Sequence, residues 1–202
     1  PHLPPAQRDA LAVLGAHVDA AGDRGAAAAR AREAAGREFY FSHVYHPAFF
    51  EGTGRAAEEI WKQCDGRPPA LWVVPVGNGS LLLGLARALE RLGAGRVKLL
   101  AVQAAGCPGL RLPGVEGHSA AAGIAIADPP RREEILAALA RHGGEVMEVG
   151  EAEIEGAHRA LGRRGVAAER ACAAALAAAQ ALRAAGERGG RLAWMTGAWL
   201  RG

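Results

Sequence analysis

Lysine, asparagine, cysteine and aromatic residues are scarce in this sequence, and long apolar runs are absent from it. Only two of the 24 basic residues are lysines, Lys62 and Lys98, and asparagine occurs once, at Asn78. No apolar run approaches the roughly 20 residues that span a membrane, and no charged-then-apolar N-terminal segment resembles a signal peptide. We therefore expect no membrane partner, and the odd number of cysteines, which favours reduced thiols, predicts a cytoplasmic protein.

Cysteine and histidine give no indication of a metal site. The three cysteines, Cys64, Cys107 and Cys172, lie far apart and form no CxxC pair, which excludes the common zinc-binding spacings. His43 and His46 have no acidic or cysteine partner at a familiar spacing, so we interpret them as loop histidines. An odd number of cysteines favours reduced thiols, and we expect each thiol to be a small buried apolar group.

The basic residues do not indicate binding to nucleic acid. A net charge of +3 and a pI near 9.1 would permit contact with a polyanion. The arginines, however, are scattered among Asp and Glu, and only 5% of the residues are aromatic. No basic stripe with interleaved aromatic residues results. We expect the arginines to form a solvated surface and predict no nucleic-acid partner.

Strands and helices are predicted to alternate along most of the 202 residues, half of which are hydrophobic. Apolar, β-branched or alternating segments predict strands at residues 15–19, 38–42, 70–76, 96–103, 145–149 and 191–196. Helical patterns predict helices at residues 3–14, 23–35 (with Asp23 as N-cap), 56–64, 81–92, 131–142, 151–164 and 168–185, with a connection at 42–54. Such alternation is typical of an α/β fold with a mainly parallel sheet flanked by helices.

The most informative segment is the glycine-rich turn at residues 77–80, Gly77-Asn78-Gly79-Ser80, which joins a predicted strand to a predicted helix. Backbone N–H groups and the positive end of the helix favour an anion such as phosphate there. Ser80 could cap the helix or donate to a phosphate oxygen. The turn is not a Walker A loop, because no lysine follows it, and Leu82 replaces the third glycine of a dinucleotide fingerprint. A tight turn without a ligand is the alternative.

Four other residues bear on the chemistry. Thr196 ends the last predicted strand, where open α/β sheets present ligand contacts, and its hydroxyl could bind a ring nitrogen without protonating it. Glu169 could stabilise the start of a helix or simply cap it. Lys62 is expected to face solvent, and Lys98 to lie away from the C-terminal strand ends. Neither lysine is therefore suited to form a Schiff base.

Several motifs in order resemble one enzyme family. The segment at residues 75–82, PVGNGSLL, resembles the phosphate loop of threonine synthases and their relatives among fold-type II, tryptophan synthase beta-like pyridoxal-phosphate enzymes. The resemblance continues along nearly the whole chain, at residues 51–53, 57–60, 101–104, 107–108, 123–126, 143–144, 153–154, 169 and 196–197.

This resemblance implies a cofactor, a domain organisation and a reaction. Residues 1–50 would be the C-terminal remnant of a small domain, and residues 51–202 the large domain that binds pyridoxal 5'-phosphate. The implied contacts are backbone groups around the phosphate and one hydroxyl on the pyridine nitrogen: Gly77, Asn78, Gly79, Ser80, Leu81 and Thr196. A homodimer would convert O-phosphohomoserine, a small amino-acid substrate, to threonine and phosphate. The alternatives are a serine/threonine dehydratase-like lyase and a non-catalytic partner or degenerate homologue.

The sequence also departs from the family pattern. The Schiff-base lysine of the family lies upstream of anything that matches Pro1, so we expect that an N-terminal part is missing. No catalytic residue is assigned to this chain, which we expect to be inactive alone. Arg170 and Ala171 replace a Pro-Ser or Pro-Thr pair, Ala122 replaces an acidic residue, and Trp199 replaces a glycine near the expected ring site.

Overall fold

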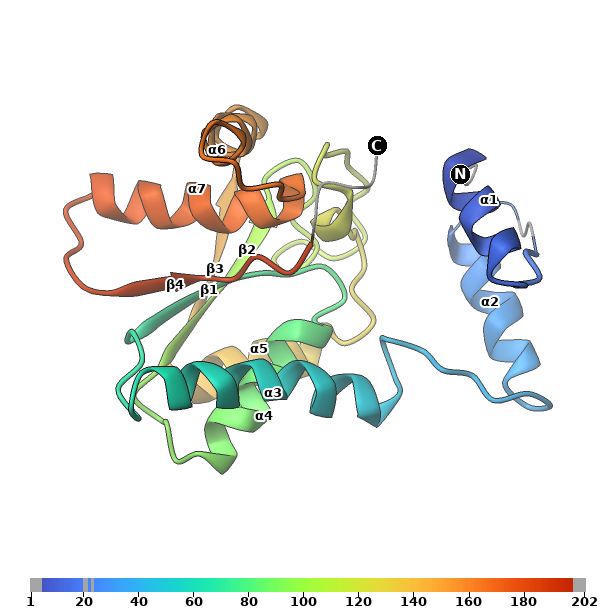
Figure 1. Cartoon of the computed structure of the whole chain (residues 1–202), viewed down its shortest axis with the longest axis horizontal. Coiled ribbons are helices and arrows are strands. Elements are labelled where there is room, and N and C mark those ends of the chain that lie inside the picture. Colours follow the sequence, from blue (N-terminus) through green and yellow to red (C-terminus); the bar gives the residue numbers. More distant parts are fainter. Residues whose placement is uncertain (1–4, 20–21, 23, 198–202) are drawn as a thin grey trace. The chain divides into compact units, whose positions relative to one another are not determined.

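The computed structural model describes residues 5–19, 22 and 24–197, and the chain divides into two units, Pro1–Ser42 and His43–Gly202. The first unit contains two helices, α1 (Pro5–Val13) and α2 (Arg24–Ala34) (Figure 1). Both agree with the helices expected there. Asp23, the expected N-cap of α2, lies outside the described residues, as does Trp199.

The two strands predicted in the first unit are wrong. Residues 14–16 instead form the turn that ends α1, with Gly15 at φ 71° and the Ala16 N–H bonded to the Leu11 carbonyl. Residues 39–42 are irregular, and the exposed rings of Phe39 and Phe41 stack on each other. A strand needs a neighbour for its N–H and C=O groups, and the described part of this unit contains none.

A parallel four-stranded sheet forms the centre of the second unit. Its strands are β1 (Leu71–Pro75), β2 (Lys98–Ala104), β3 (Glu145–Val149) and β4 (Arg191–Ala193), in the order β3-β2-β1-β4. Every pairing is parallel, and Val73 of β1 lies between Leu100 of β2 and Ala193 of β4. The predicted α/β fold with a parallel sheet is therefore confirmed, although β4 ends earlier than expected.

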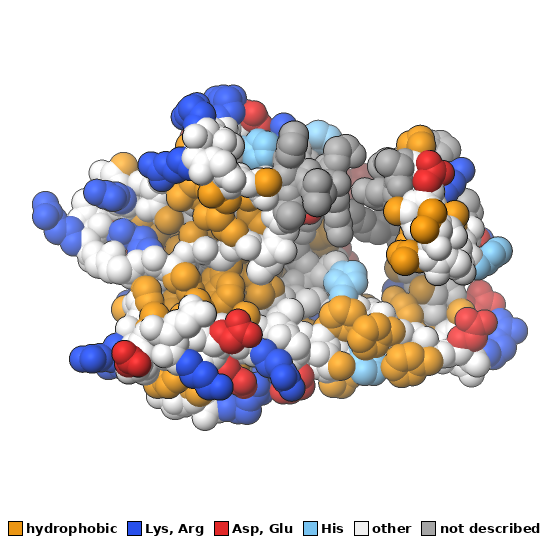
Figure 2. Space-filling model, in the orientation of Figure 1, with side chains coloured by type: hydrophobic (Ala, Val, Ile, Leu, Met, Phe, Trp, Pro, Cys, Tyr) orange, Lys and Arg blue, Asp and Glu red, His pale blue; other side chains and the backbone are white. Residues whose placement is uncertain are grey.

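Helices cover both faces of this sheet (Figure 1). On one face lie α3 (Pro47–Gln63), α4 (Ser80–Arg91) and α5 (Arg132–Arg141), and on the other lie α6 (Glu151–Arg163) and α7 (Arg170–Ala184). Neighbouring strand residues point to opposite faces: Trp72 packs in the core with α4, and Val73 in the core with α7. Figure 2 shows hydrophobic side chains between α7 and α3 along the edge of the sheet at β4.

Helix α3 begins earlier than predicted. Residues 42–54 look like a connection because they contain Pro47 and two glycines, yet the helix starts at Pro47. His46 caps it by accepting a hydrogen bond from the Ala48 N–H, and proline is well suited to the first helical turn. Gly54 is tolerated because α4 passes close by: a Cβ at Gly54 would lie 2.9 Å from the Gly84 carbonyl oxygen.

In the part of the chain that the structure describes, no helix combines the length and the hydropathy needed to cross a membrane. No group of three or more His, Cys, Asp or Glu side chains is placed to hold a metal ion among the same residues.

Candidate functional site

The glycine turn, residues 77–80, lies at the C-terminal end of β1, where α4 begins. Gly79 is the N-cap of α4 and adopts a left-handed backbone (φ 84°, ψ 2°) that favours glycine. No side chain caps the helix from this position. The N–H groups of the first turn, which begins at Ser80 and Leu81, thus meet no capping side chain, and the positive end of α4 lies at the turn. This arrangement suits an anion.

Close packing also requires both glycines of the turn. A Cβ at Gly77 would lie 2.2 Å from the Gly123 carbonyl oxygen, so the segment at residues 122–126 lies directly against the turn. A Cβ at Gly79 would lie 2.4 Å from Cδ1 of Ile135, a buried residue of α5. The backbone of the turn is therefore held between the 122–126 segment and α5.

The polar side chains of the turn contact His43. Nδ2 of Asn78 lies 3.4 Å from Nε2 of His43, and the Ser80 hydroxyl donates to the His43 carbonyl at 2.5 Å. The expectation that Ser80 caps the helix is wrong, because Gly79 is the N-cap of α4 and the Ser80 hydroxyl donates to His43 instead. Donation from Ser80 to a phosphate stays a prediction. The sequence pattern led us to interpret His43 as an ordinary loop histidine. Nothing in the local sequence indicates a contact with a residue 35 positions away.

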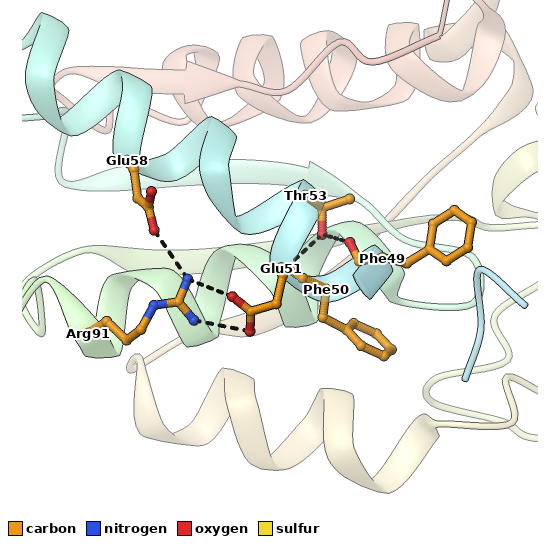
Figure 3. A network of polar contacts seen from close by, with 6 residues as sticks. All are labelled: Phe49, Phe50, Glu51, Thr53, Glu58 and Arg91. Carbon is orange, nitrogen blue, oxygen red and sulfur yellow. Dashed lines mark hydrogen bonds and ion pairs between the residues drawn. The ribbon is translucent and has the colours of Figure 1, made fainter. Parts of the chain in front are cut away.

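Helix α3 fixes the first turn of α4. Within α3, the Thr53 hydroxyl lies 2.8 Å from the Phe49 carbonyl and 3.3 Å from the Phe50 carbonyl (Figure 3). The same hydroxyl lies 3.2 Å from the Ser80 carbonyl of α4. Ser80 is thus held through its hydroxyl by His43 and through its carbonyl by Thr53. Figure 3 also shows Arg91 of α4 paired with Glu51 and Glu58 of α3. These pairs are exposed and contribute little to stability.

Thr196 lies beyond the C-terminal end of β4, at the same edge of the sheet as the glycine turn. The two strands are parallel, and the Trp194 N–H bonds to the Val73 carbonyl. Thr196 is exposed. The next residue, Gly197, is anchored to α7: its N–H lies 3.1 Å from Sγ of Cys172, and its carbonyl accepts from the Glu169 N–H.

The start of α7 connects this segment to the glycine turn. Glu169 is the N-cap residue, but its side chain does not cap the helix. Its carboxylate lies against Gly197, where a Cβ would be 2.7 Å from Cδ of Glu169. Ala171 faces Gly123, the residue that contacts Gly77.

Arg170 has a different role. Its guanidinium bonds to Glu155 on α6 and holds the pKa of that carboxyl below its ordinary value.

Neither lysine lies at this edge of the sheet. Lys98 opens β2, so it is exposed at the N-terminal end of the strands. Lys62 is exposed in the last turn of α3, as expected. The site as built from these residues offers backbone N–H groups, an amide, an imidazole and a threonine hydroxyl, but no amine.

The cysteines are not placed as nucleophiles. Cys107 and Cys172 are buried, as predicted, whereas Cys64 is only partly so. Burial raises the pKa of the Cys107 thiol, so less of it is thiolate at any given pH. We expect iodoacetamide at pH 8 to alkylate Cys64 well before Cys107 in the folded protein, as followed by peptide mass spectrometry. Equal rates in urea are the control, and equal rates in the folded state would contradict the burial of Cys107.

Three solved structures of similar fold are an L-serine ammonia-lyase, a cysteine synthase and a threonine deaminase. An L-serine ammonia-lyase from the fungus Rhizomucor miehei matches with a TM-score of 0.78 and 18% identity over 98% of this chain and 68% of its own. A cysteine synthase from Entamoeba histolytica matches with a TM-score of 0.69 and 18% identity over 86% of this chain and 52% of its own. At such identities the likeness shows the fold.

A threonine deaminase from T.th. is similar at higher identity. It matches with a TM-score of 0.59 and 27% identity over 69% of this chain and 50% of its own. This chain spans between half and about two thirds of the length of these three structures. A search of curated proteins finds no match.

A family model supplies the assignment. The model for pyridoxal-phosphate dependent enzymes matches residues 1–197, nearly the whole chain. The match includes the sheet, the glycine turn and Thr196. The chain therefore belongs to the family of pyridoxal-phosphate dependent enzymes.

Proposed function

We propose that the glycine turn holds the phosphate of pyridoxal 5'-phosphate through backbone N–H groups of residues 77–81. The observation that carries the proposal is the left-handed Gly79 at the N-cap of α4, which leaves the positive end of the helix without a capping side chain. The turn also lies at the C-terminal edge of a parallel sheet, where ligands of open α/β folds bind. A phosphate with close to two negative charges fits such a site.

We further propose that Thr196 donates a hydrogen bond to the pyridine nitrogen. Its place after β4, on the edge of the sheet that carries the glycine turn, supports this role. A neutral hydroxyl would leave the ring nitrogen unprotonated. When bound, pyridoxal phosphate acts as an electron sink for an amino acid attached to it. The residues of this chain would bind and orient the cofactor, and none of them is assigned to proton transfer.

The reaction that we propose for the whole enzyme is elimination from a small hydroxy amino acid such as serine or threonine. The 27% identity to a threonine deaminase favours it. The second candidate is a threonine synthase reaction on O-phosphohomoserine, favoured by the resemblance of residues 75–82 to that group of enzymes. A homodimer is proposed for either case. This chain alone is expected to be inactive, because both of its lysines lie away from the proposed site.

Titration with pyridoxal phosphate tests the binding site. We expect saturable binding by absorbance, with any borohydride-reduced adduct confined to the two exposed lysines because neither of them lies at the proposed site. Asn78→Asp adds a negative charge beside the phosphate without changing the side-chain shape. It is expected to weaken binding by at least about tenfold, or about 1.4 kcal/mol, since like charges repel strongly in a partly buried site.

Gln63→Glu is the matched control, because it makes the same chemical change at an exposed position. Gln63 lies ten residues along α3 from Thr53, about 15 Å at the rise of an α-helix. It should leave the affinity unchanged. Failure of the wild-type chain to bind the cofactor, or equal losses in the two variants, would contradict the proposed site.

A further inference from the structure

Arg131 is not a solvated surface arginine, contrary to the expectation for arginines in this sequence. It is the N-cap residue of α5, and only 13% of its side chain is exposed. Its guanidinium carbon lies 4.5 Å from the centre of the Phe50 ring, and Arg87 lies over the same ring at the same distance. Phe50 itself is almost fully buried. Packing thus holds the Arg131 guanidinium in one place.

From this position Arg131 holds the short turn at residues 43–45, hereafter the 43–45 turn. Its Nη1 donates to the Val44 carbonyl at 3.1 Å, across 87 residues of sequence, and its Nη2 pairs with Glu134. The ring of His43 in the 43–45 turn lies edge-on against Phe49 of α3, with centroids 6.2 Å apart. The 43–45 turn is therefore fixed by contacts to both α3 and α5.

The 43–45 turn also contacts the polar side chains of the glycine turn. His43 accepts from the Ser80 hydroxyl through its carbonyl and faces the Asn78 amide through its ring. Helix α5 also supports the glycine turn directly, because Ile135 lies beneath Gly79. Arg131 and Ile135 are four residues apart and so share one face of α5. One face of one helix thus supports the glycine turn both directly and through His43.

We propose that Arg131 is a positioning residue of the cofactor site, acting through the 43–45 turn on the side chains of Asn78 and Ser80. This inference rests on the proposed function, since it assigns the role of Arg131 to the same phosphate site. Arg131 needs no contact with the cofactor. Loss of its bond to Val44 frees His43, and the amide of Asn78 then loses its fixed orientation.

Asn78 offers a direct reading of this effect, because it is the only asparagine in the sequence. Protein labelled with ¹⁵N-asparagine has a single ¹⁵N-labelled side-chain amide, and the NMR signals of that amide report the surroundings of Nδ2. Arg131→Met is expected to shift these signals in the absence of any ligand. Arg132→Met is the matched control: it removes the same charge and also a bond to a backbone carbonyl, but at Leu110. It should leave the Asn78 signals in place.

The affinity for pyridoxal phosphate tests whether Arg131 acts on the cofactor site through His43. Arg131→Met and His43→Ala are each expected to raise the dissociation constant about tenfold, and the double variant by about the same factor, because both act on one connection. Single effects that multiply to about a hundredfold would mean that Arg131 acts independently of His43. Either that result or unmoved Asn78 signals in Arg131→Met would overturn the proposal.

The Asn78 NMR signals and the affinity for pyridoxal phosphate together distinguish failure of the proposed function from failure of the role proposed for Arg131. If the wild-type chain does not bind the cofactor, the proposed function fails, while the Asn78 signals of the free protein still decide whether Arg131 positions the glycine turn. Thermal unfolding of each variant shows whether the fold is retained. A melting temperature lowered in Arg131→Met with unchanged Asn78 signals would reduce Arg131 to a purely structural role and overturn the inference.

Discussion

Gly77→Ala is expected to abolish measurable binding of pyridoxal phosphate while the sheet still forms. The added methyl would lie 2.2 Å from the carbonyl oxygen of Gly123 and 3.2 Å from Cγ1 of Ile126. The first neighbour is backbone and cannot rotate away, so the glycine turn or the 122–126 segment must move. Overpacking of this kind typically costs about 1–3 kcal/mol of stability. A displaced turn no longer directs its N–H groups to one point, and we expect at least a hundredfold loss of affinity by absorbance titration.

Gly156→Ala is the control for the Gly77 variant. Gly156 lies in α6, and a Cβ there would meet nothing within 4 Å. Alanine favours the helix over glycine, so this variant should bind the cofactor normally and gain about 0.5–1 kcal/mol of stability. Retained affinity in Gly77→Ala would show that the turn tolerates displacement and that its N–H groups do not define the site.

Gly84→Ala is expected to lower the free energy of unfolding by about 3 kcal/mol or more, the largest effect on stability among our predictions. A Cβ at Gly84 would lie 1.9 Å from the Thr53 hydroxyl and 2.7 Å from the Phe50 carbonyl oxygen. Helices α3 and α4 would have to separate, which would also release the Thr53 contact to Ser80 at the start of the glycine turn. Urea denaturation followed by tryptophan fluorescence measures the change.

A second substitution tests whether the clash with Thr53 causes the loss of stability in Gly84→Ala. Thr53→Ala removes the nearer of the two clashes, so the double variant Thr53→Ala/Gly84→Ala should recover part of the lost stability, with the contact to the Phe50 backbone unrelieved. Gly52→Ala, one turn into α3 and open to solvent, is expected to be neutral or slightly stabilising. Simple addition of the Thr53 and Gly84 effects would show that their contact does not determine the packing of the two helices.

The fold was predictable where local patterns and tertiary packing agree. Strand β1 and the centre of β2, residues 99–102, are continuous apolar runs, as expected for strands covered on both faces. The wrong predictions fall where packing against distant segments, and not the local pattern, determines the secondary structure. Gly54 suggests a connection, but it lies within helix α3, where α4 passes too close to leave room for a side chain. Residues 38–42 have strand-like composition but no neighbouring strand among the described residues. Neither neighbour can be inferred from the sequence of the segment itself.

The candidate site was predictable only in its local part. Residues 77–80 stand out because strand, glycines and helix follow one another directly. His43 and Arg131 enter through contacts over 35 and 87 residues of sequence. No local pattern distinguishes Arg131 from the other arginines, since its burial under the 43–45 turn depends on the position of Phe50. Contacts between residues so far apart in the sequence can be identified only from the structure.

The pairing of β4 with β1 has a consequence for the order in which the protein assembles during synthesis. Leu71 of β1 pairs with Lys98 of β2 early in the chain, but its other neighbour, Arg191 of β4, is made about 120 residues later. Until then one edge of β1 carries unpaired N–H and C=O groups and can recruit another nascent chain. The ribosome thus completes the glycine turn long before it delivers Thr196, so the proposed phosphate site would form in a translation intermediate that still lacks the proposed contact to the ring.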